Sequence, residues 1–151
     1  MTYDRKDYLQ AEVAGASPVG LVVLLYDRLI MDLTRALAAI DRGDIEARAG
    51  ELNHAFLILG QLEGSLDAEH APESAQTQAL FYNMARSKIL EAHLKTDRKL
   101  LEQQVALFNE VRSAWEQIDP VRKAKTPLAP TLPIAATGEG NEELASLDAS
   151  A

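Results

Sequence analysis

Proline placement is the feature that most constrains what this chain can fold into. Its six prolines lie at positions 18, 72, 120, 127, 130 and 133. Proline lacks a backbone donor and its ring clashes with the preceding turn, so the interior of a helix excludes it. The spacing therefore leaves two long stretches, 19–71 and 73–119, that are open to helices.

Capping residues divide these stretches further. Gly43 can close a helix in the left-handed conformation, and Asp44 can cap the helix that follows. Asp97 is a second capping residue inside the later stretch. Ser17 before Pro18 is a strong helix start, because serine caps well and proline fits the first helical position. We therefore predict four helices, over 18–41, 45–66, 73–95 and 98–118, with a polar connector between the second and the third.

Apolar residues recur at helical spacing in the predicted segments. In the first segment they step by four and three, which places them on one helix face; they are Val22, Tyr26, Leu29, Leu33, Ala36 and Ile40. Short connectors favour antiparallel neighbours over an extended coiled coil. The predicted fold class is all-α, an antiparallel four-helix bundle with a short N-terminal segment and a disordered C-terminal tail. Residues 1–119 form the bundle domain with a lead-in over 1–17, and 120–151 form an acidic tail that contains proline and glycine.

Composition excludes several classes of partner. A formal net charge of −8 disfavours nucleic acid, because phosphate binding needs a dense field of Lys and Arg. The most apolar run covers 19–26, far short of the roughly 20 residues that span a bilayer, so we expect no membrane span. The N-terminus lacks the pattern of a secretory signal and the chain has no cysteine. A cytoplasmic protein is the expectation.

The histidines give weak chemical signals. Glu51 and His54 match the Glu-x-x-His element of di-iron bundles, but such sites need a second element and further glutamates. The sequence has no phosphate-binding loop and no nucleophile elbow. We predict no enzyme, no metal site and no cofactor. The alternative is a histidine phosphotransfer bundle, in which His93 or His54 would carry the phosphoryl group.

The chain has more apolar positions than a minimal bundle can bury. One interpretation is a thick core, and another is a groove for an amphipathic helix, which docks through anchors at i, i+3, i+4 and i+7. A bundle without a client would use the same surface for a homodimer, so monomer and homodimer both stay open. Gly50, Gly60 and Gly64 share one face of the second helix, and each costs roughly 0.5–1 kcal/mol relative to alanine. Either this helix frays or a partner approaches its backbone.

A series of short motifs runs along the chain. They are Tyr8-Leu9-Gln10, Ala16-Ser17-Pro18, Leu24-Leu25-Tyr26-Asp27, Gly43-Asp44-Ile45 and Ser65-Leu66-Asp67, with looser matches at Ile89-Leu90-Glu91-Ala92 and Arg112-Ser113-Ala114-Trp115. In order and spacing, over about residues 3–118, this series resembles the FliS-type flagellar export chaperones. Arg28 departs from the pattern, because a glycine commonly follows Leu-Tyr-Asp in that family.

The resemblance implies a function. It implies a cytosolic chaperone that binds the C-terminal helical region of flagellin, prevents premature polymerisation and supports flagellar type III export. Components of the export apparatus are further partners that it implies. It also implies that the N-terminal segment lies over or next to a groove, and the candidates for this cover are Tyr3, Tyr8 and Leu9. For the lining of the groove we predict Tyr26, Leu57, Ile58, Phe81 and Tyr82.

Overall fold

A computed structural model describes residues 17–119. Its elements are α2 (Pro18–Arg42), α3 (Ile45–Gly64), α4 (Pro72–Lys95) and α5 (Arg98–Gln117). The predicted all-α fold with four helices is confirmed, and every helix begins and ends within two residues of its predicted limits. The predictions for 1–16 and for 120–151, the disordered tail among them, lie outside the described residues.

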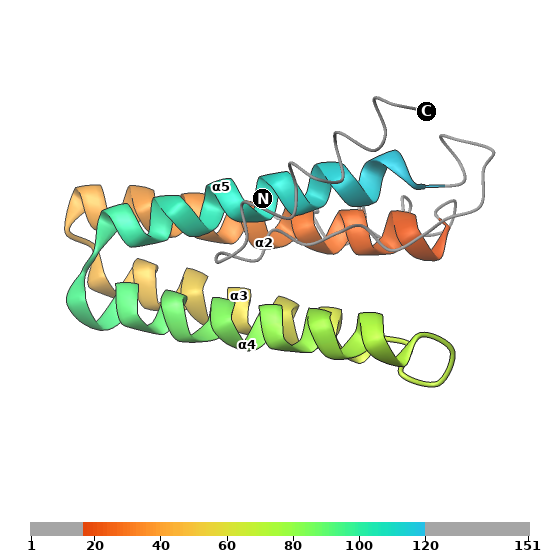
Figure 1. Ribbon diagram of the computed structural model, residues 1–151. Coiled ribbons are helices and arrows are strands. Elements are labelled where there is room, and N and C mark those ends of the chain that lie inside the picture. Colours follow the sequence, from red (N-terminus) through yellow and green to blue (C-terminus); the bar gives the residue numbers. More distant parts are fainter. Residues whose placement is uncertain (1–16, 120–151) are drawn as a thin grey trace, which may run out of the picture.

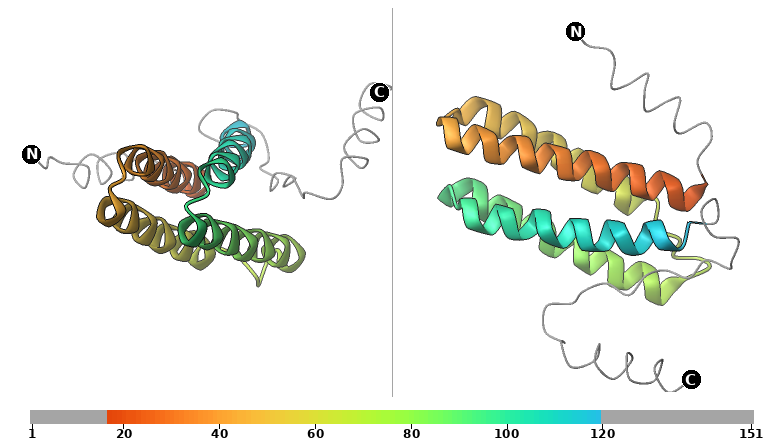
Figure 2. Two further views of the ribbon diagram at one scale, coloured as in Figure 1. Left: turned by 90° about the vertical axis from the view of Figure 1, so that its left-hand side faces the viewer. Right: turned by 90° about the horizontal axis from the view of Figure 1, so that it is seen from above.

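The four helices form an antiparallel bundle in which each packs against its neighbour in the chain and α5 closes the ring against α2 (Figure 1, Figure 2). The end-on view in Figure 2 shows one helix at each corner, with α2 diagonally opposite α4. The contacts of α2 with α3 and α5 are more extensive than those that α4 makes with the same two helices. The two pairs of helices that include α2 therefore lie closer together than the two pairs that include α4.

Local chemistry explains where α2 begins and where the chain turns into α3. Ser17 Oγ accepts the backbone N–H of Gly20 at 2.9 Å, and Pro18 occupies the first turn. Gly43 ends α2 with a φ of 68°, a left-handed conformation that glycine adopts at little cost. The Asp44 carboxylate then caps α3. These signals act within a few residues, which is why the sequence alone places both helix ends.

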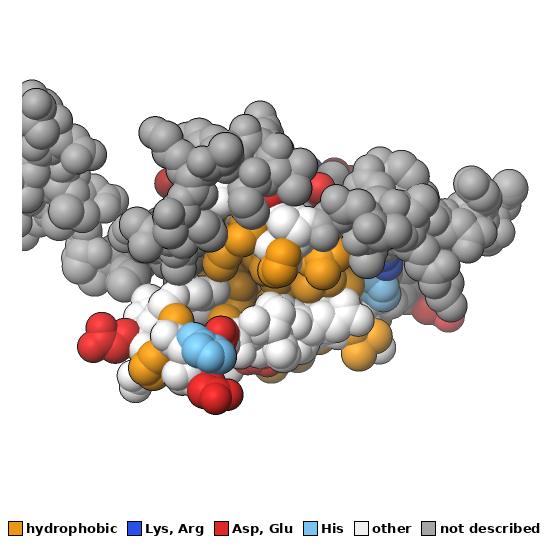
Figure 3. All heavy atoms as spheres, turned by 90° about the vertical axis from the view of Figure 1, so that its right-hand side faces the viewer, with side chains coloured by type: hydrophobic (Ala, Val, Ile, Leu, Met, Phe, Trp, Pro, Cys, Tyr) orange, Lys and Arg blue, Asp and Glu red, His pale blue; other side chains and the backbone are white. Residues whose placement is uncertain are grey.

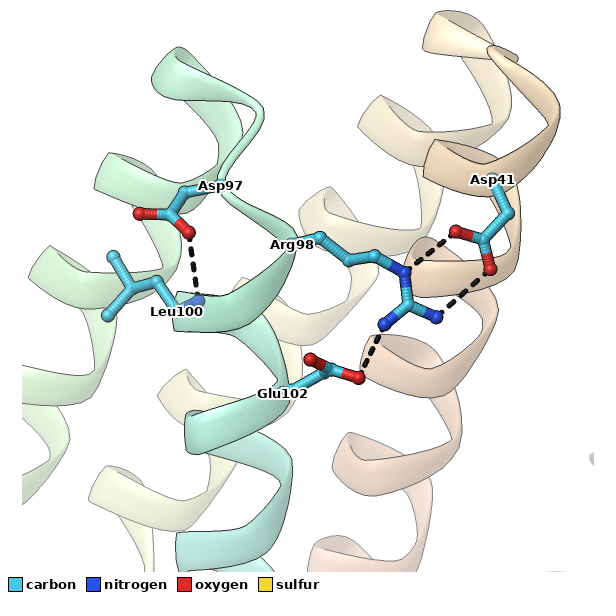
Figure 4. A network of polar contacts seen from close by, with 5 residues as sticks. All are labelled: Asp41, Asp97, Arg98, Leu100 and Glu102. Atoms are coloured by element: carbon cyan, nitrogen blue, oxygen red, sulfur yellow. Dashed lines mark hydrogen bonds and ion pairs between the residues drawn. The ribbon is translucent and has the colours of Figure 1, made fainter.

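The turn between α4 and α5 is tied to the end of α2 (Figure 4). Asp97 Oδ1 accepts the Leu100 N–H at 3.0 Å and so caps α5. Arg98 donates to both carboxylate oxygens of Asp41, at 2.7 and 3.0 Å, and also to Glu102 on the next turn of α5. The hydrogen bonds from Arg98 lower the pKa of Asp41. This fork joins two helices that are neighbours in the bundle although 57 positions separate Asp41 from Arg98.

The core is built around aromatic rings at the centre of the bundle. Tyr26 of α2, Phe81 and Tyr82 of α4 and Phe108 of α5 pack with ring centroids between 5.7 and 6.5 Å apart. The hydroxyls of Tyr26 and Tyr82 share a hydrogen bond of 2.9 Å that spans the diagonal of the bundle. Aliphatic residues from all four helices surround this cluster, among them Leu29, Leu33, Leu52, Leu59, Leu62, Ile89, Leu101 and Val111.

Candidate functional site

Several large apolar side chains remain in solvent. Leu57 is 64% exposed, and α4 turns four such residues away from the core. Scattered exposed leucines are normal on protein surfaces, so exposure alone does not mark a binding site. The full set in the described residues is Met31, Ile45, Leu57, Leu80, Met84, Leu90 and Leu94.

An open groove runs between α2 and α3, with a volume of about 410 Å³. We call it the α2/α3 groove. Each wall is a row of residues at positions i, i+3, i+4 and i+7 of its helix, which is the spacing of one helix face. The α2 wall is Leu21, Leu24, Leu25 and Arg28, and the α3 wall is His54, Leu57, Ile58 and Gln61. Five of the eight lining side chains are aliphatic, and the polar ones come from both walls.

A short hydrogen-bonded chain lies beside this groove. Arg28 of α2 bonds to His54 Nε2 at 3.1 Å, and His54 Nδ1 bonds to Asp32 Oδ2 at 2.6 Å. Asp32 is fully buried, and its second oxygen, Oδ1, has no partner within the described residues. Burial raises the pKa of Asp32, and the hydrogen bond from His54 opposes that rise. The chain links α2 to α3 where the two walls meet.

A second hollow of about 160 Å³ lies at the end of the bundle where α2 begins and α4 follows its loop. We call it the end hollow. Figure 3 views this end and shows apolar side chains gathered in a recess. Its apolar lining comes from α2, α4, α5 and the loop between α3 and α4, and consists of Val22, Leu66, Ala71, Ala75, Tyr82 and Trp115. The Trp115 Nε1 donor is buried without a partner in the described part of the chain.

The structure separates the residues predicted to line a groove. Leu57 and Ile58 lie in the α2/α3 groove, Leu57 largely exposed and Ile58 3% exposed. Tyr26, Phe81 and Tyr82 belong to the core cluster, and of these Tyr82 also borders the end hollow. Partner binding by these five residues stays a prediction. The proposed cover of Tyr3, Tyr8 and Leu9 lies outside the described residues.

Sequence reasoning missed part of the α2/α3 groove. Leu21, Leu24 and Leu25 line it, together with Arg28 and Gln61. The four α2 residues of this set follow the i, i+3, i+4, i+7 spacing of one helix face. That face lies next to the more strongly apolar face of α2 that forms the core, so the sequence pattern alone did not single it out. Only the placement of α3 against α2 shows which of the two stripes stays open.

The three glycines of α3 lie on its solvent side. Gly50, Gly60 and Gly64 are exposed, and a Cβ added at any of them would meet nothing within 4 Å. Within the described residues, nothing approaches this backbone closely. The two interpretations, a helix that frays and a surface for a partner, therefore both remain.

The histidines of the described helices are held by neighbouring side chains. Arg48 Nε donates to His93 Nδ1 at 3.2 Å, while His54 lies between Arg28 and Asp32. Residues 17–119 contain no group of three His, Cys, Asp or Glu side chains that could hold a metal ion. None of the described helices is long and apolar enough to cross a membrane.

The family model and the known proteins that this chain resembles agree in their description. Residues 1–122 match the family model described as flagellar protein FliS. The flagellar secretion chaperone FliS of Salmonella typhimurium is 30% identical over 113 residues, which cover 74% of this chain and 84% of that protein. The flagellar secretion chaperone FliSB of Pseudomonas aeruginosa is 31% identical over 110 residues, which cover 73% of this chain and 87% of that protein. The flagellar secretion chaperone FliS of Vibrio cholerae is 28% identical over 116 residues, which cover 77% of this chain and 85% of that protein.

Proposed function

The chain belongs to the FliS family of flagellar proteins, and from this we propose that it is a cytoplasmic chaperone for flagellin. It would bind the C-terminal helical region of flagellin, prevent premature polymerisation and support flagellar type III export. The relatives named above are flagellar secretion chaperones, which supports a role in export rather than in catalysis.

The observation that carries this proposal is the pair of matched rows in the α2/α3 groove. A helix docks into a groove through anchors at i, i+3, i+4 and i+7. Two neighbouring helices that leave such rows partly uncovered offer a guest helix the same packing that they give each other. The exposed Leu57 would be covered only when a guest is present.

Binding energy sets a lower limit on the contact area. Ordering a disordered segment costs about 2–5 kcal/mol of the gross interaction energy. A groove of about 410 Å³ holds only a few side chains of the guest. We therefore expect the flagellin segment to extend beyond the groove, with a total interface above the roughly 1,600 Å² of a standard complex.

Calorimetry with the C-terminal segment of flagellin from the same organism tests the proposal. We expect one-to-one binding, a negative heat-capacity change and a gain of helicity in the segment. The absence of binding heat over a range of temperatures would refute the proposal. Light scattering on the free protein and on the mixture reports whether the protein is a monomer or a homodimer, and a homodimer that ignores the segment would support a bundle without a client.

A matched pair of variants locates the binding surface. Leu57→Ser removes a side chain worth about 1.5–3 kcal/mol when buried, so we expect at least about tenfold weaker binding. Because Leu57 is already 64% exposed, unfolding stability should change by no more than about 0.5 kcal/mol. Leu80→Ser is the control, since Leu80 is 59% exposed on the outer face of α4, and should bind as the wild type does. Equal losses in both variants would contradict the assignment to this groove.

A further inference from the structure

Among the residues of 17–119 that line the α2/α3 groove, Arg28 is the only one with a formally charged side chain. The other seven lining residues are five aliphatic side chains, a histidine and a glutamine. Binding sites for helices and small ligands are mostly apolar, with a few polar groups that fix the orientation of the guest. The position of Arg28, at the end of the α2 wall, fits such a group.

The hydrogen bonds around Arg28 fix the state of His54. A guanidinium has donors only, so His54 Nε2 accepts from Arg28 at 3.1 Å. His54 Nδ1 therefore carries the proton and donates to Asp32 Oδ2 at 2.6 Å. His54 is neutral in this arrangement and separates the positive charge in the groove from the buried carboxylate.

Arg28 is left with unused donors. Arg86, Arg98 and Arg112 each pair with a carboxylate, whereas Arg28 has no ion pair within residues 17–119. Its Nε atom is buried and has no hydrogen-bond partner there. The donors that a guest can reach are therefore those of the two Nη groups that His54 does not use, and a guanidinium can hold a carboxylate through two parallel bonds. Within the described residues, Arg28 thus contacts no carboxylate directly, and the nearby charge of the buried Asp32 reaches it only across His54.

We propose that Arg28 anchors a carboxylate of the helical segment that occupies the α2/α3 groove, an inference that rests on the proposed function. The carboxylate belongs to an Asp or Glu side chain of the flagellin segment, at the edge of the apolar stripe that packs on Leu24, Leu25 and Leu57. Apolar contacts supply the affinity, while the ion pair fixes the direction and register in which the guest helix lies.

The test is a double-mutant cycle measured by calorimetry. Arg28→Gln is combined with a set of flagellin segments in which each Asp or Glu is changed singly to Asn or Gln. We expect Arg28→Gln to weaken binding of the unmodified segment about tenfold or more. One segment substitution should weaken binding to the wild type by a similar factor and have little further effect on Arg28→Gln.

Two further variants separate charge from fold. Arg35→Gln is the control, because Arg35 is an exposed residue of α2 outside the groove and its replacement makes the same change in net charge. It should bind as the wild type does. Arg28→Lys keeps the charge but loses the fork, so its affinity should lie between those of the wild type and Arg28→Gln. Added salt should weaken the wild-type complex more than that of Arg28→Gln.

The outcomes are distinct. If the wild type binds no segment, the proposed function fails. If the wild type binds but Arg28→Gln binds equally well, only the anchor fails. If Arg28→Gln binds more weakly but no acidic residue of the segment couples to it, Arg28 only positions His54 and the proposal is overturned. A urea denaturation curve for each variant ensures that the protein compared is folded.

Discussion

The hydroxyl pair of Tyr26 and Tyr82 allows a sharp test of how the core is held together. Both side chains are buried, at 0% and 1% exposure, and their oxygens lie 2.9 Å apart. Tyr26→Phe and Tyr82→Phe each keep the ring and remove one oxygen. Each single substitution therefore leaves the remaining hydroxyl without its partner and shielded from water.

The expected magnitudes follow from this geometry. An unsatisfied buried polar group costs about 1–3 kcal/mol, so each single variant should lose about 2 kcal/mol of unfolding free energy. The double variant removes donor and acceptor together and should lose about 1 kcal/mol or less. The loss in the double variant then falls short of the sum of the single losses by about 3 kcal/mol, at the upper end for residues in direct contact.

Urea denaturation followed by far-UV circular dichroism measures all four proteins, with the dependence on urea expected to stay unchanged. Each single variant should also melt roughly 8 °C below the wild type, on the scale of a domain of this size. A double variant whose loss equals the sum of the single losses would refute the reasoning, because it would mean that the two hydroxyls do not satisfy each other.

Three further predictions concern stability. Burial raises the pKa of Tyr82 to about 12 and also raises the pKa of Tyr26, so both ionise first in the unfolded chain. Between about pH 10 and 12 each should lower the unfolding free energy by roughly 1.4 kcal/mol per pH unit, and Tyr82→Phe should lose one of these two contributions; urea curves across this range measure the slopes. The hydrogen bonds from Arg86 lower the pKa of Glu63, so Glu63→Gln should lower the unfolding free energy by about 0.5–1 kcal/mol at neutral pH. The difference between this variant and the wild type should vanish as the pH falls through the pKa of Glu63 in the folded protein, as urea curves at each pH would show. Gly60→Ala should gain about 0.5–1 kcal/mol because the added Cβ meets open space, whereas Gly43→Ala should lose stability at its φ of 68°; thermal melts compare the two.

Local signals made the fold predictable. Pro18, Gly43, Asp44 and Asp97 determine helix ends through contacts within a few residues, and the structure places the helix limits close to the predicted ones. Periodicity predicts which residues share a helix face. It does not predict which of two apolar faces meets the core, because that depends on the neighbouring helix.

This limit explains what the sequence left open about the site. Tyr26 and Leu57 are both apolar positions within helices, yet one lies at the centre of the core and the other in solvent. The contact of Arg28 with His54 joins positions 26 apart in the chain, and that of His54 with Asp32 joins positions 22 apart. Arg28 and Asp32 share one face of α2 at i, i+4 spacing, but only the packing of α3 on α2 brings His54 to them.

The apolar residues on opposite sides of α4 have a consequence for how that helix finds its orientation. Leu80 and Met84 point outward while Phe81 and Ile89 point inward, so hydrophobicity alone would tolerate the helix rotated about its own axis. Directional bonds remove this freedom. The Tyr82 hydroxyl is hydrogen-bonded to Tyr26 of α2, and the Arg86 guanidinium of α4 donates to both carboxylate oxygens of Glu63 on α3. The hydrogen bond and the ion pair thus select one rotation of α4 about its axis, where apolar contacts alone would discriminate poorly between rotations.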